Sequence, residues 1–73
     1  MYGRRACHLC EEARGVILAE RARGTRFEFD EVTVDGDPEL ERDYGVRVPV
    51  VEVDGREAFE IAVEPTRLRR LLG

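Results

Sequence analysis

The sequence predicts an α/β fold in which helices flank a mixed β-sheet. Two observations lead to this prediction. Helix-like and strand-like segments alternate along the 73 residues, and Asp54-Gly55 between two β-rich runs is a strong two-residue hairpin signal. Helices that flank a mixed sheet bury such alternating apolar patterns economically. At this length we expect residues 1–73 to form one domain with one small core.

The first predicted helix runs from about His8 to Arg23, and Gly24 has the position of the residue that follows a helix. Its apolar residues share one face: Leu9, Ala13, Val16 and Ile17. Before it, only Met1 and Tyr2 have room to form a strand, because Gly3 is expected to open a loop. The predicted first strand is therefore unusually short.

A second strand is predicted from Phe27 to Val34, which is rich in aromatic and β-branched residues. Its apolar residues change phase along the run, as in a strand that is buried on both faces or bulged. Asp37 and Pro38 then mark the start of a short helix, as N-cap and first helical residue, and Gly45 ends it.

The hairpin is predicted to join strands at Val46–Val53 and Arg56–Ile61, and Glu64-Pro65 to begin a closing helix with leucines along one side. The two-residue loop predicts these cross-strand pairs: Val50 with Phe59, Val48 with Ile61, and Glu52 with Glu57. The last pair places like charges opposite each other, which is mildly unfavourable unless an arginine lies nearby.

The segment most informative about function is Cys7-His8-Leu9-Cys10, at the start of the first predicted helix. The chain has no other cysteines, so neither thiol can pair elsewhere within it. The spacing leaves three interpretations open: a redox-active dithiol, half of a metal site, or two reduced thiols without a role. A lone Cys-x-x-Cys beside a strand and helix pattern is more typical of redox chemistry than of a structural disulfide.

The position of Cys7 favours it as the nucleophile. A cysteine at a helix N-terminus faces unpaired N–H groups and the positive end of the helix dipole, which favour the reactive thiolate. Arg4, Arg5 and His8 would add positive potential. Cys10, nearly one turn inside the helix, is predicted to be the less exposed, resolving thiol. Two alternatives remain for His8, a third metal ligand or a residue that is merely solvated.

Composition and charge exclude several classes of protein. Twelve Lys and Arg against sixteen Asp and Glu give a net charge of −4, which argues against a protein that binds nucleic acid through phosphate contacts. No apolar run has the length of a membrane helix, and the N-terminus lacks the apolar core of a secretory signal. We therefore expect a cytoplasmic protein with no membrane contact.

Several short motifs, spread over nearly the whole chain, resemble those of glutaredoxin-like proteins in the thioredoxin-fold superfamily. They are Tyr2-Gly3, Cys7-His8-Leu9-Cys10-Glu11-Glu12-Ala13, Val34-Asp35, Asp37-Pro38, Tyr44-Gly45, Arg47-Val48-Pro49-Val50 and Asp54-Gly55-Arg56. The resemblance implies a thioredoxin-like, glutaredoxin-type fold, a mixed four-stranded sheet in the order 2-1-3-4 flanked by three helices.

The sequence departs from that family in two places. The first strand, central in the family's sheet, is truncated here to its last residues, so its neighbours would be left with unpaired backbone groups. We therefore expect the true start of the protein to lie upstream of Met1. The glycine pair that follows the fourth strand in glutathione-binding glutaredoxins is absent here, where the sequence reads Ile61-Ala62-Val63-Glu64, which leaves glutathione as an uncertain partner.

The resemblance implies a thiol-disulfide oxidoreductase that reduces protein or small-molecule disulfides, working as a monomer without a cofactor. The residues expected to act are Cys7 and Cys10 in catalysis, and Arg4, His8, Val48 and Pro49 in substrate binding. Pro49 is expected to be cis and to lie beside the disulfide, with the main chain of Val48 pairing with substrate. The alternatives are a dimer that shares a metal ion or iron–sulfur cluster through Cys7 and Cys10, and a redox-inert adaptor.

Overall fold

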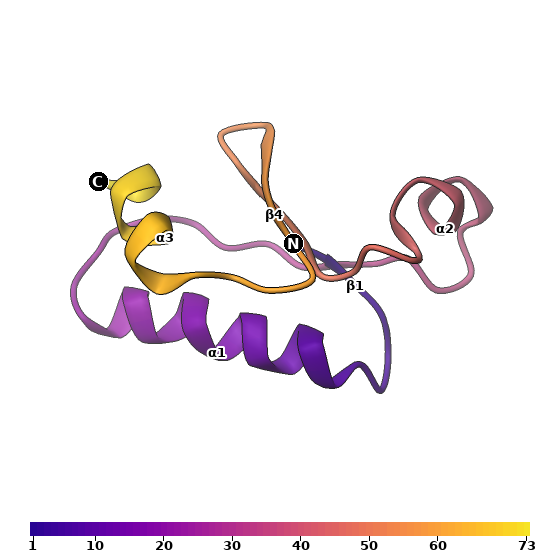
Figure 1. Ribbon diagram of the computed structural model, residues 1–73, viewed down its shortest axis with the longest axis horizontal. Helices are drawn as coiled ribbons and strands as arrows, with labels where there is room; N and C mark the ends of the chain where they lie inside the picture. Colours follow the sequence, from indigo (N-terminus) through magenta and orange to yellow (C-terminus); the bar gives the residue numbers. More distant parts are fainter.

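The computed structural model describes the whole chain, residues 1–73. Its elements are β1 (Tyr2–Gly3), α1 (His8–Ala22), β2 (Val32–Thr33), α2 (Pro38–Tyr44), β3 (Val50–Val53), β4 (Arg56–Glu60) and α3 (Pro65–Leu72). The strands form one sheet in the order β2-β1-β3-β4, in which β1 is parallel to β2 and antiparallel to β3 (Figure 1). The predicted fold class and strand order are confirmed.

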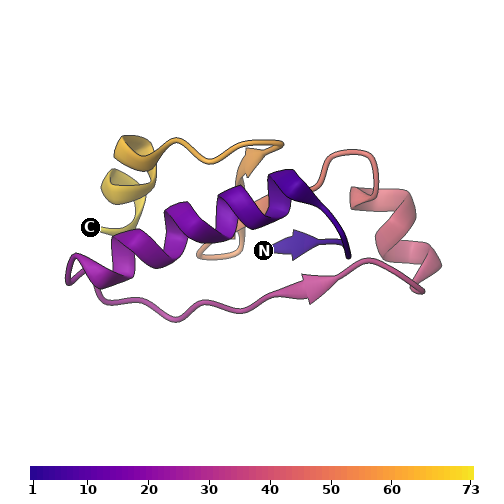
Figure 2. The same ribbon diagram turned by 90° about the horizontal axis from the view of Figure 1, so that it is seen from below.

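The helices lie at different ends of the molecule. α1 and α3 pack against each other on one side of the sheet, whereas α2 lies apart from both, at the far end of the long axis (Figures 1 and 2). None of the three helices combines the length and apolarity needed to cross a membrane.

Local sequence signals explain where the helices begin. A carboxylate oxygen of Asp37 accepts hydrogen bonds from the backbone N–H groups of Glu39 and Leu40, at 3.1 and 3.2 Å. Glu64 caps α3 in the same way through its two carboxylate oxygens. The N–H groups of the first turn have no partner inside the helix, so these caps stabilise both helix starts where the sequence predicts them.

The hairpin between β3 and β4 forms at the predicted turn and keeps the predicted register next to it, but the register shifts further along the strands. The observed pairs are Val50 with Glu60, Val51 with Phe59, Glu52 with Glu57 and Val53 with Arg56. A β-bulge after Glu57 leaves Ala58 without a partner and shifts the register by one residue. The predicted pair of Val50 with Phe59 is therefore wrong. The pair of Val48 with Ile61 is also wrong, because β3 begins only at Val50.

The like-charge pair of Glu52 and Glu57 is observed as predicted, and an arginine relieves it. Two guanidinium nitrogens of Arg47 donate to the two carboxylate oxygens of Glu57, at 3.0 and 3.1 Å. This bidentate contact holds the pKa of Glu57 below its ordinary value. The pair is tolerated because one of its two charges is neutralised.

The second strand is much shorter than the predicted run from Phe27 to Val34, since only Val32 and Thr33 pair with β1. Strand pairing needs a neighbour, and β1 offers only two residues. Residues 25–31 are extended without belonging to the sheet, and they run beside α1 (Figure 2).

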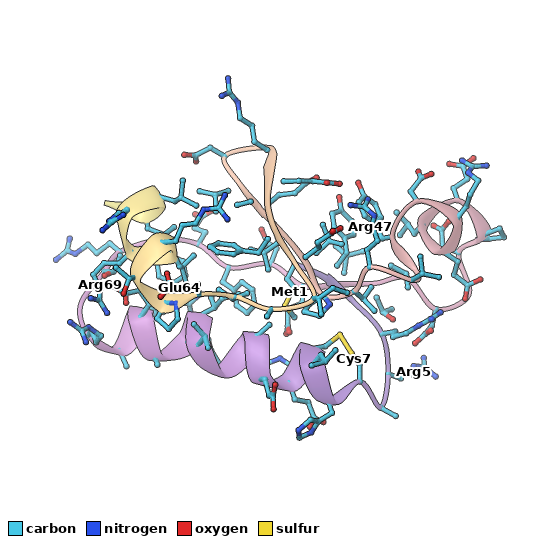
Figure 3. The ribbon with its side chains drawn as sticks, in the orientation of Figure 1. Met1, Arg5, Cys7, Arg47, Glu64 and Arg69 are labelled. Atoms are coloured by element: carbon cyan, nitrogen blue, oxygen red, sulfur yellow. A yellow bond between two sulfur atoms is a disulfide. The ribbon has the colours of Figure 1, made fainter.

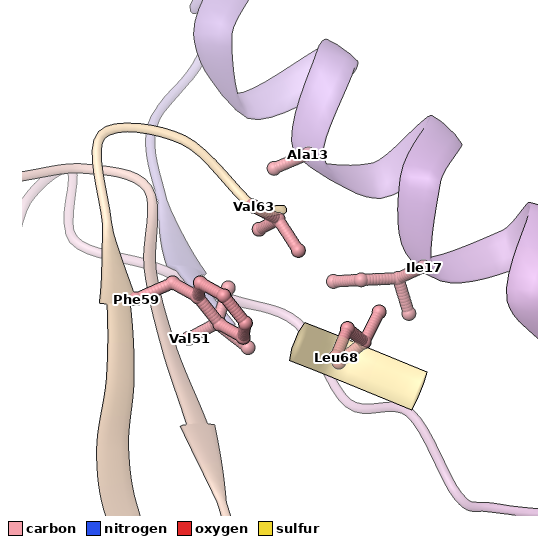
Figure 4. Close-up of a cluster of buried hydrophobic side chains, with 6 residues drawn as sticks. All are labelled: Ala13, Ile17, Val51, Phe59, Val63 and Leu68. Carbon is pink, nitrogen blue, oxygen red and sulfur yellow. The ribbon is translucent and has the colours of Figure 1, made fainter. Parts of the chain in front are cut away.

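The core divides into two clusters. The larger one joins α1, the hairpin and α3 (Figure 4), and consists of Ala13, Ile17, Val51, Phe59, Val63 and Leu68. The smaller one contains Cys10, Val34 and Val48, with the half-buried Tyr2 and Tyr44 packed against it. The two clusters hold opposite halves of α1, and the smaller cluster lies at the end that carries the cysteines.

Candidate redox site

Cys7 and Cys10 form a disulfide at the start of α1 (Figure 3). Cys7 is the N-cap with an extended backbone, and Cys10 lies in the first turn, 5.2 Å away between Cα atoms. The backbone N–H of Cys10 donates to the sulfur of Cys7 at 3.1 Å. Cys7 is half-buried, whereas Cys10 is only 2% exposed. The sulfur of Cys7 is thus the accessible one, in the order of exposure that the sequence predicts.

Gly3 lets β1 approach the buried sulfur. A Cβ atom at this position would lie 3.2 Å from the sulfur of Cys10, closer than side chains normally pack. The sequence predicts a loop at Gly3, but Gly3 is the second residue of β1. Its role is therefore to leave room for Cys10 against the sheet, which the sequence pattern alone does not reveal.

Asp35 organises the loop in front of Cys7, and sequence reasoning did not assign it a role. Its carboxylate accepts from the backbone N–H of Arg5 at 2.7 Å and from the guanidinium of Arg4 at 3.3 Å. The first of these bonds does most to lower the pKa of Asp35, which stays ionised. The signal available in the sequence was the Val34-Asp35 motif, whose partners lie about 30 residues earlier.

Arg4 is directed away from the cysteines and toward α2. Besides Asp35, its guanidinium donates to the backbone oxygen of Gly45 at 3.3 Å and to the carboxylate of Glu41 at 3.4 Å. Two carboxylates therefore offset its charge. The guanidinium of Arg5, by contrast, makes no ion pair or hydrogen bond within the protein. Of the two arginines, Arg5 is the one with an uncompensated charge in the loop before Cys7.

His8 lies on the solvent side of the motif. Its side chain is 82% exposed, and its Nε2 atom lies 3.0 Å from a carboxylate oxygen of Glu12, one turn further along α1. Within one chain, no three His, Cys, Asp or Glu side chains come together in a way that could hold a metal ion. A metal shared between two chains would have to take its protein ligands from Cys7 and Cys10 of each.

Val48 packs against Cys10, and Pro49 follows Val48 in the chain. The peptide bond between them is cis, which confirms the isomer expected from the resemblance. Val48 is 8% exposed and belongs to the same cluster as Cys10, and Pro49 is fully buried. The aromatic rings of Tyr2 and Tyr44, which pack against this cluster, stack with centroids 4.1 Å apart. Burial raises the pKa of Tyr44 above its ordinary value, so it remains a neutral phenol.

Ile61 has a strained backbone next to this proline. Its φ is 71°, in the left-handed region that a β-branched residue rarely adopts, and its N–H donates to the oxygen of Pro49 at 2.9 Å. Glycine takes this conformation readily. A glycine at this position would therefore fit the backbone, whereas isoleucine adds both strain and an apolar side chain that is 42% exposed.

Comparisons with known proteins agree with this geometry. The family model described as "Glutaredoxin-like domain (DUF836)" matches residues 1–73. The chain is also similar to a solved structure, the X-ray structure of Northeast Structural Genomics target protein XcR50 from X. campestris, with a TM-score of 0.79 and 39% sequence identity. The match covers 97% of this chain and 89% of that one. The search of curated proteins gives no match.

Proposed function

Because the chain belongs to the glutaredoxin-like domain family, we propose that it is a thiol-disulfide oxidoreductase whose working group is the Cys7–Cys10 pair. One observation carries the proposal. An accessible cysteine at a helix N-terminus is bonded to a buried cysteine one turn inside the same helix. In disulfide exchange by a dithiol protein, the substrate must reach one sulfur. The second sulfur is shielded from the substrate but lies close enough to attack the first.

The reaction begins with the dithiol form of the protein. The thiolate of Cys7 attacks one sulfur of a substrate disulfide, forms a mixed disulfide, and releases the other substrate sulfur as a thiolate that takes up a proton. The thiol of Cys10 then loses its proton and attacks the sulfur of Cys7. This step re-forms the Cys7–Cys10 disulfide and releases the second substrate thiol. Two electrons pass from the protein to the substrate, and a reducing thiol must return them.

Local structure supports this division of roles. In the reduced protein, the N–H of Cys10 and the other unpaired N–H groups at the start of α1 would stabilise negative charge on the sulfur of Cys7. Cys10 has no such exposure, since it packs in the cluster with Val34 and Val48. Burial in apolar surroundings raises the pKa of a thiol, so Cys10 is the poorer initial nucleophile.

We assign substrate binding to the surface around Cys7. The main chain of Val48, before the cis Pro49, is proposed to pair with an extended substrate backbone. Val46, two residues earlier, is 93% exposed, which suits contact with an apolar substrate side chain. Arg4 and His8 are proposed to supply positive charge. Arg4 would first have to give up contacts to Asp35 and Glu41.

The proposed substrates are disulfides of proteins or small thiols, reduced in the cytoplasm by a monomeric protein. Glutathione is the less favoured small thiol, because the glycine pair that glutathione-binding glutaredoxins have after the fourth strand is absent from Ile61-Ala62-Val63-Glu64.

A trapping experiment tests the proposal. Without Cys10 the mixed disulfide on Cys7 has no internal sulfur to resolve it, so Cys10→Ser should accumulate reducible adducts in a native extract. Cys7→Ser and the double variant are the controls, and both should accumulate none. Mass spectrometry of adducts released by reductant then identifies the substrate as glutathione or as a protein. The proposal fails if Cys10→Ser traps nothing, and stoichiometric metal in the wild-type protein would favour the shared metal site instead.

A further inference from the structure

The loop between β1 and α1 is held by a single backbone hydrogen bond. The chain turns sharply through residues 4–6 to bring Cys7 to the start of the helix (Figure 2). The N–H of Arg5 makes the only hydrogen bond that the backbone of these residues forms within the protein. Its acceptor is a carboxylate oxygen of Asp35, at 2.7 Å. The position of the loop therefore depends on one side chain that lies 30 residues further along the chain.

Asp35 takes the bond that would otherwise continue the sheet. β1 is parallel to β2, and the ladder between them ends where the N–H of Val34 donates to the oxygen of Gly3 at 2.8 Å. In a parallel ladder the next bond would run from the N–H of Arg5 to the oxygen of Val34. That oxygen accepts instead from the N–H of Asp37 at 3.2 Å. Because the side chain of Asp35 satisfies Arg5, the chain can leave the sheet after Gly3 and turn toward α1.

Ala6, the residue before Cys7, has a strained backbone. Its φ is 51°, in the left-handed region, which alanine adopts only at a cost. The residue is exposed, so burial offers little compensation. The hydrogen bond of the preceding residue, Arg5, is the contact of the loop backbone that can hold this conformation. Strain that one contact maintains beside a reactive group indicates a role in placing that group.

The carboxylate of Asp35 is itself held in place. Its other oxygen accepts from the guanidinium of Arg4 at 3.3 Å. The hydroxyl of Thr33 donates to the oxygen that Arg5 uses, at 3.4 Å, and accepts from the backbone N–H of Asp35 at 3.3 Å. The bond from Arg5 does most to hold the pKa of Asp35 below its ordinary value. The carboxylate is therefore ionised, with both oxygens available as acceptors, at every pH at which a thiol titrates.

The turn determines how Cys7 enters α1. Cys7 is the N-cap, and the N–H of Cys10 donates to its sulfur at 3.1 Å. A sulfur in this position lies among N–H groups that have no partner inside the helix, and these groups stabilise a thiolate. If the loop relaxes, the sulfur moves away from them and the thiolate loses that stabilisation.

We propose that Asp35 is a positioning residue for the redox site. Through the N–H of Arg5 it holds Ala6 in the strained turn, and the turn keeps the sulfur of Cys7 at the N-terminus of α1. Asp35 makes no hydrogen bond to either cysteine and acts only through the loop. The proposal rests on the proposed role of Cys7 as nucleophile, but it concerns the reactivity of the thiol and requires no particular substrate.

Alkylation of the thiol tests the proposal. All variants carry Cys10→Ser, so that Cys7 is the only thiol, and the rate of reaction with iodoacetamide is measured from about pH 5 to pH 10. Only the thiolate reacts, so the profile gives the midpoint at which half of the thiol is ionised. The charged groups close to Cys7 in sequence are the same in all variants, namely Arg4, Arg5, His8, Glu11 and Glu12.

The direction of the expected shift separates positioning from charge. Asp35→Ala should move the midpoint to higher pH and lower the rate near pH 6 by about three- to tenfold, with an unchanged plateau at high pH. Charge alone predicts the opposite direction. Loss of a carboxylate, which also frees the guanidinium of Arg4, would stabilise a thiolate and move the midpoint to lower pH.

Three further variants separate the hydrogen bond from the charge. Asp35→Asn keeps an oxygen that can accept from Arg5 but loses the charge, so it should retain most of the rate near pH 6. Glu41→Gln removes the same charge from the other carboxylate that contacts Arg4, and it should not raise the midpoint. Glycine adopts positive φ readily, so Ala6→Gly should restore part of the rate that Asp35→Ala loses.

Ala6→Val tests the turn without changing Asp35. A β-branched residue resists positive φ, so this exposed substitution should also move the midpoint to higher pH. It keeps the proposal testable if Asp35→Ala does not fold. Hydrogen exchange reports the bond itself, because the amide of Arg5 should exchange at least about tenfold faster in Asp35→Ala than in the parent protein.

Several outcomes would overturn the proposal. One is an unchanged or lowered midpoint in Asp35→Ala when the amide of Arg5 exchanges fast. Another is an equal rise in Glu41→Gln, which would make charge the cause. A rate that falls equally at every pH would show that Asp35 has a merely structural role. If Cys10→Ser traps no substrate but the midpoints shift as expected, the redox function is contradicted and the role of Asp35 is not.

Discussion

The backbone of Ile61, whose N–H donates to the oxygen of Pro49, is strained in the folded protein. A non-glycine residue in the left-handed region costs about 1–3 kcal/mol unless contacts compensate. Ile61 is 42% exposed, so only part of its side chain gains from burial. The strain falls on a residue whose N–H donates to the oxygen of Pro49.

Replacing this residue tests the strain directly. Ile61→Gly should raise the free energy of unfolding by about 1 kcal/mol, since relief of strain exceeds the extra chain entropy that glycine brings to the unfolded state. Ala62→Gly is the matched control, because Ala62 is also exposed and has no positive φ. It should lower stability slightly. A fall in the urea midpoint of Ile61→Gly would show that side-chain contacts outweigh the strain.

At the scale of elements, α1 and α3 are joined by a charged contact at the border of the core. Glu20 of α1 is 3% exposed, and its carboxylate accepts from the hydroxyl of Thr25 at 2.6 Å and from the guanidinium of Arg69 in α3 at 3.1 Å. The hydrogen bond from Thr25 does most to lower the pKa of Glu20. A buried carboxylate that loses one of its donors keeps its desolvation cost without compensation.

Two neighbouring arginines of α3 allow this contact to be tested with a matched pair. Arg69→Met should lower the urea midpoint clearly, because it leaves Glu20 with one side-chain donor fewer. Arg70→Met removes the same charge one residue later, from a side chain that makes no hydrogen bond or ion pair, and should change the midpoint little. Equal effects of the two substitutions would show that net charge, rather than the contact, determines stability.

The elements also show which parts of the fold were predictable from sequence. Helix starts depend on residues within one turn, so Asp37 and Glu64 were sufficient to place α2 and α3. The length of β2 depends on β1, a partner about 30 residues away, which no local pattern encodes. The bulge at Ala58 lies within the hairpin, but the alternation of residues along β3 and β4 does not reveal it. The Asp54-Gly55 turn was local and correct, since both residues have the positive φ that this turn requires.

In the candidate site, too, features that depend on nearby residues were predictable and features that depend on distant residues were not. The positions and relative exposure of Cys7 and Cys10 could be predicted, because both depend on one helix start. The ion pairs of Arg4 could not be predicted, because its carboxylate partners lie more than 30 residues away in the sequence. The cis isomer of Pro49 was expected only from the family resemblance, since an Arg-Val-Pro-Val string does not by itself determine a peptide isomer.

For the whole molecule, the pH dependence of stability should be set by a few carboxylates that are hydrogen-bonded in the folded state. The residues concerned are Glu20, Asp35, Glu57 and Glu64, and each has a pKa below its ordinary value. The main cause is the hydroxyl of Thr25 for Glu20, a backbone N–H for Asp35 and Glu64, and the guanidinium of Arg47 for Glu57. Because these contacts are spread along the chain, acid should weaken the fold as a whole and not one element alone.

The sign of the effect follows from proton uptake. Each of these groups binds a proton more weakly in the folded than in the unfolded protein, so each stabilises the fold above its unfolded pKa. That stabilisation is lost as the pH falls through the folded pKa. We therefore expect the urea midpoint to decrease steadily between about pH 5 and pH 2.

Glu20→Gln should lower the urea midpoint at neutral pH and flatten this decrease, because the variant lacks one of the groups that take up a proton on unfolding. Glu28→Gln, at an exposed side chain without a hydrogen bond, should leave both the midpoint and its slope unchanged. Parallel curves for Glu20→Gln and the wild type would show that the buried carboxylate does not contribute to acid sensitivity.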